Sequence, residues 1–134
     1  MDRCGIPAVL VKELTSAINQ HLAAEFQAGR TYLAMSIWLR EKDLAGFSTY
    51  RHDQSQEERG HAARMIAYLV DSDEQVELPT IEAPERSWPS VQTLFDQVYD
   101  MEKGVTASIN RLYAMAEARF VRKRLRLAGD NRGA

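Results

Sequence analysis

Cysteine is nearly absent from this sequence, and so are several patterns that indicate other chemistries. The 134 residues include a single cysteine, Cys4, which excludes a disulfide within the chain and a structural zinc site built from thiolates. The sequence also contains no glycine-rich phosphate loop, no serine or cysteine triad pattern and no strand-like alternation. These absences favour an all-helical protein of a reducing compartment, and we expect it in the cytoplasm.

Long apolar runs and scattered prolines are lacking as well. The apolar run from Ile6 to Val11 is too short to cross a membrane, and no small-residue cleavage pattern accompanies it. Three of the four prolines fall between Asp71 and Pro89. With 45% hydrophobic and 27% charged residues, the chain is long enough for one soluble domain with a core and too short for two.

Three segments carry apolar residues at helical spacing. The first is expected to begin at Pro7, and its stripe consists of Leu10, Leu14, Ile18, Leu22, Tyr32, Met35 and Leu39. The second extends from about Phe47 to Leu69, and its inward line is predicted to hold Phe47, Tyr50, Met65 and Leu69. The third is capped by Ser90 and ends near Ala118, and its stripe consists of Val91, Phe95, Val98, Val105, Ile109 and Leu112.

The two connections predict the topology. Residues 41–46 are charged and contain a glycine, so the first two helices should be joined by a short turn and lie antiparallel. Residues 71–89 have neither helical nor strand period and are long enough to run the whole length of the second helix. We therefore predict a crossover that brings the third helix back parallel to the second.

Charge is distributed unevenly. Residues 119–134 hold 6 of the 17 basic residues and 1 of the 19 acidic ones, so this tail carries +5 and the preceding residues carry −7. We predict a helical domain over residues 1–118 and a poorly ordered basic tail over residues 119–134.

Four side chains suited to metal binding replace apolar residues on the predicted inward faces. Glu25 and Glu102 are in register with the stripes of the first and third segments, and Glu58 and His61 lie three residues apart on the second. Each alone could be a solvated boundary residue. Together they indicate a metal site, because several buried carboxylates resist ionisation until a cation compensates them. Carboxylates with an imidazole suit Fe(II), with Mn(II) or Zn(II) as competitors.

These residues lie in a pattern that resembles the non-haem bacterial ferritins. The resemblance extends from residue 10 to about residue 118, and the spacings of 33 between Glu25 and Glu58 and of 44 between Glu58 and Glu102 fit the family. Its motifs are Tyr32-Leu33-Ala34-Met35, Trp38-Leu39, Gly46-Phe47, Gln56-Glu57-Glu58-Arg59-Gly60-His61-Ala62 and Met101-Glu102. The resemblance implies a ferritin-like helical bundle.

The resemblance also implies a di-iron ferroxidase centre. Glu25 and His61 would bind the first iron, Glu58 would bridge both ions, and Glu102 would bind the second. In the family, Fe(II) is oxidised by dioxygen or hydrogen peroxide, and Fe(III) is stored as mineral inside a hollow shell of 24 subunits. The implied function is iron storage and detoxification.

Several neighbours of this centre have expected roles. By resemblance, Tyr32 would be an aromatic beside the site, and Glu57 would serve an accessory iron position or remain a solvated neighbour. Haem-binding relatives have a methionine where this chain has Arg59, so no haem is expected. His21 is expected to be a boundary residue.

Two features depart from the family pattern. Arg51 lies on the inward face of the second segment, where it would either pair with a carboxylate or weaken the core. Residues 119–134 do not resemble the fourth helix of the family, which supplies further ligands, so we expect that helix to be missing or replaced by the basic tail. The tail is interpreted as a charged extension without a selected role, or as a nucleic-acid contact. Besides the ferroxidase, the sequence thus leaves open an inactive, co-assembling ferritin subunit and a helical nucleic-acid binder.

Overall fold

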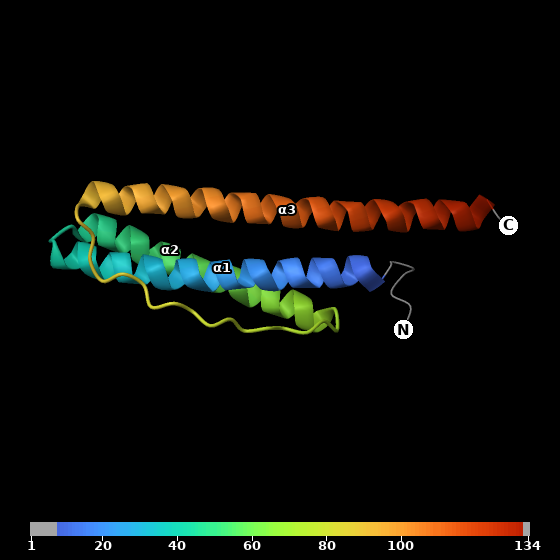
Figure 1. Cartoon of the computed structure of the whole chain (residues 1–134), viewed down its shortest axis with the longest axis horizontal. Coiled ribbons are helices and arrows are strands. Elements are labelled where there is room, and N and C mark those ends of the chain that lie inside the picture. Colours follow the sequence, from blue (N-terminus) through green and yellow to red (C-terminus); the bar gives the residue numbers. More distant parts are fainter. Residues whose placement is uncertain (1–7, 133–134) are drawn as a thin grey trace.

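Three long helices make up the fold. The computed structural model describes the backbone of residues 8–132 and the side chains of residues 12–118. Its helices are α1 (Ala8–Glu41), α2 (Ala45–Asp71) and α3 (Val91–Arg132), with no strand in this part of the chain. Figure 1 shows α2 returning antiparallel to α1, and the crossover then bringing α3 back parallel to α2. The predicted all-α bundle with a long crossover is confirmed, whereas Cys4 and the expected helix start at Pro7 lie outside the described residues.

Both turns after α1 and α2 are built in the same way. At the end of α1, Asp43 adopts a left-handed backbone with φ 59°, and the amide of Leu44 bonds the carbonyl of Leu39 at 3.0 Å. Asp73, with φ 56°, makes the corresponding turn after α2. Such six-to-one bonds satisfy carbonyls that a helix end would otherwise leave unpaired. The expected breaker, Gly46, instead lies inside α2.

The last helix is longer than the sequence predicts. Ser90 caps it as expected, because the Ser90 hydroxyl accepts a hydrogen bond from the amide of Thr93 at 3.1 Å. The helix then continues past its expected end at Ala118 and reaches Arg132. The strong helix formers Arg, Lys, Leu and Ala in this segment account for the continuation. The division of the chain into a domain of residues 1–118 and a tail of residues 119–134 stays a prediction. Across the described residues, no helix is both long enough and apolar enough to cross a membrane.

The crossover between α2 and α3 is fastened along α1 by two amide side chains. Asn19 donates to the carbonyl of Gln75 at 3.0 Å and accepts from the amide of Glu77 at 2.9 Å. Gln27 forms the same pair with one residue, donating to the carbonyl of Glu82 at 3.1 Å and accepting from its amide at 3.0 Å. These side chains satisfy backbone groups in a segment that has no secondary structure of its own.

The core is divided into two apolar clusters. One lies toward the end of α1 and consists of Ala28, Tyr32, Met35, Trp38, Leu39, Trp88, Leu94 and Val98. The other lies nearer its beginning and consists of Leu14, Ile18 and Leu69. The buried polar residues His21 and Glu25 lie on α1 between the two clusters. The stripe predicted for the first helix is thus buried from Leu14 to Leu39, whereas the side chain of Leu10 lies outside the described residues.

The inward line of α2 differs from the predicted one at the start of the helix. Phe47 and Tyr50 are 49% and 59% exposed, and the buried residues of α2 are Arg51, Ser55, Ala62 and Leu69. At the start of α2 the contact line is therefore shifted by one position, from Tyr50 to Arg51, whereas Leu69 is buried and Met65 packs against its cluster as predicted. Phe47 instead meets the ring of Phe95 edge to face, with the centroids 5.3 Å apart.

Candidate metal centre

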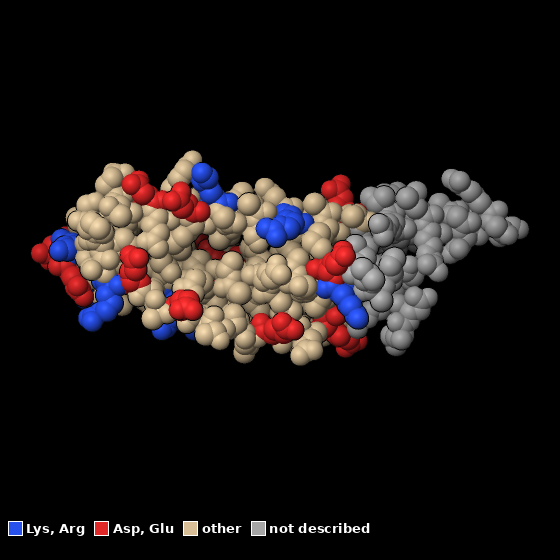
Figure 2. Space-filling view, in the orientation of Figure 1, with Lys and Arg blue, Asp and Glu red and all other residues tan. Residues whose placement is uncertain are grey.

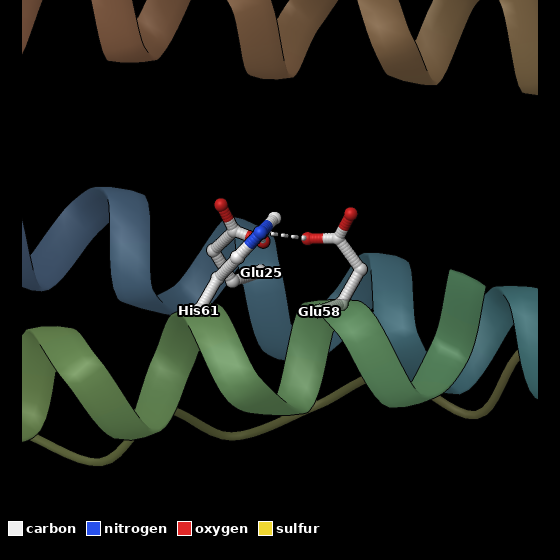
Figure 3. A group of neighbouring side chains, drawn as sticks. All are labelled: Glu25, Glu58 and His61. Atoms are coloured by element: carbon white, nitrogen blue, oxygen red, sulfur yellow. Dashed lines mark ion pairs between the residues drawn. The ribbon is translucent and has the colours of Figure 1, made fainter. Parts of the chain in front are cut away.

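Three of the four predicted ligands converge where α1 and α2 pack together. Glu25 comes from α1, and Glu58 and His61 come from successive turns of α2, because a spacing of three residues places both on one helix face. The Nδ1 atom of His61 lies 3.5 Å from Oε2 of Glu25 and 3.5 Å from Oε2 of Glu58. Figure 3 shows the three side chains pointing toward one another, on the side along which α3 runs. One ligand atom from each residue lies within 4.8 Å of the other two.

The carboxylates of this cluster are buried without enough donors. Glu25 is 1% exposed, and its Oε2 atom and that of Glu58 have no hydrogen-bond partner among the described residues. A buried carboxylate oxygen without a donor is costly, and a second one beside it adds repulsion. A divalent cation between these atoms removes both penalties, so the donor set fits a metal ion with oxygen and imidazole ligands.

Glu25 is held in place by His21, which the sequence analysis placed at the boundary of the core. His21 is not a boundary residue: its side chain is fully buried, and its Nε2 atom lies 2.8 Å from Oε1 of Glu25. Its Nδ1 atom lies 2.6 Å from Oγ of Ser108 on α3. The spacing of four residues between His21 and Glu25 could have indicated this pair. Nothing in the sequence indicates Ser108, because its contact depends on how α3 packs against α1.

The fourth predicted ligand, Glu102, does not join the cluster. Its side chain is exposed, and its Oε1 atom accepts a hydrogen bond from Nε2 of Gln54 at 2.9 Å. Gln54 in turn accepts a hydrogen bond from the buried guanidinium of Arg51. This guanidinium lies over the rings of Tyr50 and Phe95, with distances of 4.9 and 5.5 Å to the centroids. Arg51 therefore faces inward as predicted, and among the described side chains it is linked to a carboxylate through Gln54.

Tyr32 and Glu57, the expected neighbours of the site, differ in their surroundings. Tyr32 is 2% exposed, and its burial, with a contribution from the Glu102 carboxylate, raises the pKa of its phenol to about 12. Arg51 acts in the opposite direction. Glu57 is exposed and is not part of the cluster. Tyr32 therefore remains a neutral phenol at physiological pH, and the accessory role of Glu57 stays a prediction.

An apolar groove leads to the cluster. It encloses about 520 Å³ and is lined by residues of all three helices, with Ile18, Met65 and Leu112 among its walls and Glu25 and His61 at the cluster. Figure 2 shows acidic and basic side chains scattered over the face in view, with acidic atoms recessed in a hollow between them. Because His61 is 42% exposed, the cluster is accessible to small solutes.

Comparisons with known proteins agree with this geometry. The model of the ferritin-like domain family matches residues 15–120. The bacterial non-heme ferritin of Campylobacter jejuni is 35% identical over 104 residues, which is 78% of this chain and 62% of that protein. The bacterial non-heme ferritin of Bacteroides fragilis is 28% identical over 110 residues, covering 82% of this chain and 69% of the relative.

The solved structures give the same assignment. An open pore ferritin from the archaeon Archaeoglobus fulgidus superimposes with a TM-score of 0.75 and 31% identity, over 81% of this chain and 66% of that one. The chain thus spans about two thirds of the length of the relatives that it matches. With three helices in the same arrangement and with a family match over most of its residues, this chain belongs to the ferritin family.

Proposed function

We propose that this chain binds Fe(II) as a substrate and oxidises it to Fe(III) for storage. The observation that carries the proposal is the pair of buried carboxylate oxygens, on Glu25 and Glu58, that lack a donor and face the imidazole of His61. Hard carboxylate ligands stabilise Fe(III) more than Fe(II), so this environment favours the oxidation. Membership in the ferritin family supports iron as the metal.

Each oxidant accepts two electrons, whereas one Fe(II) ion gives one. The reaction therefore consumes two Fe(II) ions, bound together or one after the other. Two Fe(II) ions release two electrons when they become Fe(III). Dioxygen accepts these electrons with two protons to give hydrogen peroxide, or hydrogen peroxide accepts them with two protons to give two water molecules. The apolar groove beside the cluster supports access for either small oxidant.

A di-iron centre is the finer part of the proposal. Glu25 and His61 would hold the first ion, and Glu58, whose Oε2 atom faces the same point, would bridge to the second. Glu102 would complete the second position if its carboxylate left the hydrogen bond with Gln54 and bound the metal instead. Because this exchange costs a hydrogen bond of about 1 kcal/mol, the second ion should bind more weakly than the first.

Assembly into a storage shell is also proposed. The relatives are named as ferritins, and the exposed apolar side chains, such as Ile37 at 54% and Leu78 at 71%, are suited to contacts between subunits. A shell of 24 copies, as the family resemblance implies, would give the ferric product an enclosed volume.

An iron titration and an oxidation time course on the size-fractionated full chain test this function. We expect saturable anaerobic binding of Fe(II) and, under air, oxidation faster than in buffer alone. Glu58→Gln should weaken binding by about 100-fold or more, because it removes the charge shared by both positions. The matched control is Glu13→Gln, the same change at an exposed position of α1, which should behave as the wild type.

Two outcomes would contradict the proposal. Oxidation no faster than in buffer, with no saturable binding, would identify the chain as an inactive ferritin subunit. Equal activity in Glu58→Gln and Glu13→Gln would place the chemistry elsewhere in the molecule.

A further inference from the structure

We propose that His21 is a positioning residue that aims Glu25 at the metal, and that Ser108 makes this aim depend on the position of α3. The inference rests on the proposed function, since it assigns a role in the same site. It starts from a chain of two short contacts, in which Ser108, His21 and Glu25 connect α3 to the candidate ligand on α1.

The two oxygens of Glu25 have different surroundings. Oε1 lies 2.8 Å from Nε2 of His21, whereas Oε2 is buried without a hydrogen-bond partner among the described residues and lies 3.5 Å from Nδ1 of His61. The last torsion of a glutamate side chain is broad, so an unrestrained carboxylate rotates readily. The contact with His21 fixes that rotation, and it keeps Oε2 toward His61 and Glu58.

Glu25 and Ser108 bond the two ring nitrogens of His21 on opposite sides. Glu25 as a carboxylate offers only lone pairs, so the neutral ring of His21 must carry its proton on Nε2. Its Nδ1 atom then accepts the hydroxyl proton of Ser108, at a distance of 2.6 Å. With the opposite tautomer, two lone pairs would face each other at Glu25. Glu25 therefore fixes the ring form, and the hydroxyl of Ser108 satisfies Nδ1 in that form and holds the ring in place.

Burial prevents His21 and Glu25 from exchanging their contact for water. His21 and Glu25 are 0% and 1% exposed, so water does not reach the hydrogen bond between them. The two residues lie on one face of α1, one turn apart, and only the third member comes from α3. A shift of α3 along α1 would thus remove the hydroxyl from His21 and loosen the metal ligand without touching the metal.

Binding of Co(II) to the full chain tests the inference. Calorimetry gives the affinity, and the visible absorption of bound Co(II) reports the geometry of its ligands. If His21 only stabilised the fold, replacing it would leave this spectrum unchanged. We expect His21→Leu to weaken Co(II) binding by about 10- to 100-fold and to alter the spectrum. His21→Gln, whose amide can still donate to Glu25, should recover most of the affinity.

The contribution of α3 has its own pair of variants. Ser108→Ala should weaken binding by about 3- to 10-fold with a shifted spectrum, and Ser108→Thr, which keeps the hydroxyl, should resemble the wild type. His52→Gln changes an exposed histidine of α2 and serves as the control. Helix content and melting temperature, measured for each variant, separate a loss of the site from a loss of the fold.

The results distinguish this inference from the proposed function. A folded His21→Leu protein with the affinity and spectrum of the wild type would overturn the role of His21. If that variant does not fold, a wild-type spectrum in Ser108→Ala overturns the connection to α3. A wild-type chain that binds no Co(II) would instead remove the proposed function itself, whereas binding lost in Glu58→Gln but kept in His21→Leu removes only the inference.

Discussion

Glu25 and Glu102 occupy equivalent places in the sequence pattern and very different places in the structure. Both carboxylates interrupt an apolar helical stripe. Glu25 is buried and has one oxygen held by His21 and the other left for the cluster. Glu102 is exposed and is held by Gln54. The α1–α2 side of the site is therefore assembled, whereas the α3 side contributes a carboxylate that is engaged elsewhere.

The difference follows from how closely the helices pack. At Gly29 of α1, an added Cβ would lie 3.5 Å from the Cβ of Glu58, so the backbones of α1 and α2 approach closely at the level of the cluster. In Figures 1 and 3, α3 lies farther from this pair. Val105 and Ile109, which follow Glu102 on the stripe of α3, are only partly buried. A helix stripe positions a ligand only where the facing helix is close enough to define its direction.

The largest expected effect compares the two carboxylates directly. Glu25→Ala should weaken binding of the first Zn(II) ion by about 100-fold or more, because it removes a ligand that is already in position. Glu102→Ala should change the affinity for that ion by only about threefold, since the Glu102 carboxylate is bound to Gln54. Calorimetric titration of both variants measures the contrast, and equal losses would mean that Glu102 is a ligand of the first ion.

A smaller effect concerns Tyr32, whose pKa is influenced by the carboxylates of both Glu25 and Glu102. Its pKa is raised from 10.0 to about 12, so between these values the unfolded chain releases the phenol proton while the folded chain retains it. The free energy of unfolding should therefore fall as the pH rises through this range, by about 3 kcal/mol in total. Urea unfolding at a series of pH values tests this, with Tyr32→Phe as the variant that lacks this part of the decline.

The pKa of Tyr32 also allows the electrostatic effects of Glu25 and Glu102 to be compared. Of the charges that raise the pKa of Tyr32, Glu102 contributes more than Glu25. Glu102→Gln should therefore lower this pKa further than Glu25→Gln does, as followed by tyrosinate absorbance against the Tyr32→Phe background. The reverse order would place Glu102 farther from Tyr32 than the structure does.

The smallest effect concerns the crossover that leads to α3. Gln27→Ala removes two hydrogen bonds to the backbone of Glu82 and should lower the free energy of unfolding by about 1 kcal/mol. Gln20→Ala is a matched control, because it makes the same change at an exposed position of the same helix and so cancels helix propensity. Thermal unfolding measures the difference, and no difference would show that the crossover is held by its other contacts.

Much of the fold was predictable because each helix carries its own signals. The stripe of α1, the cap at Ser90 and the period-free segment with three prolines predicted the helices, the crossover and the parallel return of α3. The prediction was wrong about the end of α3, since the basic segment after Ala118 continues the helix. It was also wrong about Phe47 and Tyr50, because a shift of one position in the contact line of α2 exposes both.

The candidate site was predictable only in part. The spacing of Glu58 and His61 places them on one face of a helix whatever surrounds it, and the structure brings both to Glu25. His21 could have been recognised from its spacing to Glu25, although the hydrogen bond requires burial that the sequence does not report. The hydrogen bond of Gln54 to Glu102, and that of Arg51 to Gln54, depend on how α3 lies beside α2, which the sequence of neither helix reports.

The sequence by itself determined which residues share a helix face, because an α-helix repeats every 3.6 residues regardless of its surroundings. It thereby determined the types of the candidate ligands, the order of the helices and the resemblance to the ferritins. Only the tertiary structure decided which carboxylate is buried and free for a metal and which is exposed and bound to an amide. That choice depends on distances between helices, and these distances follow from packing that no single helix contains.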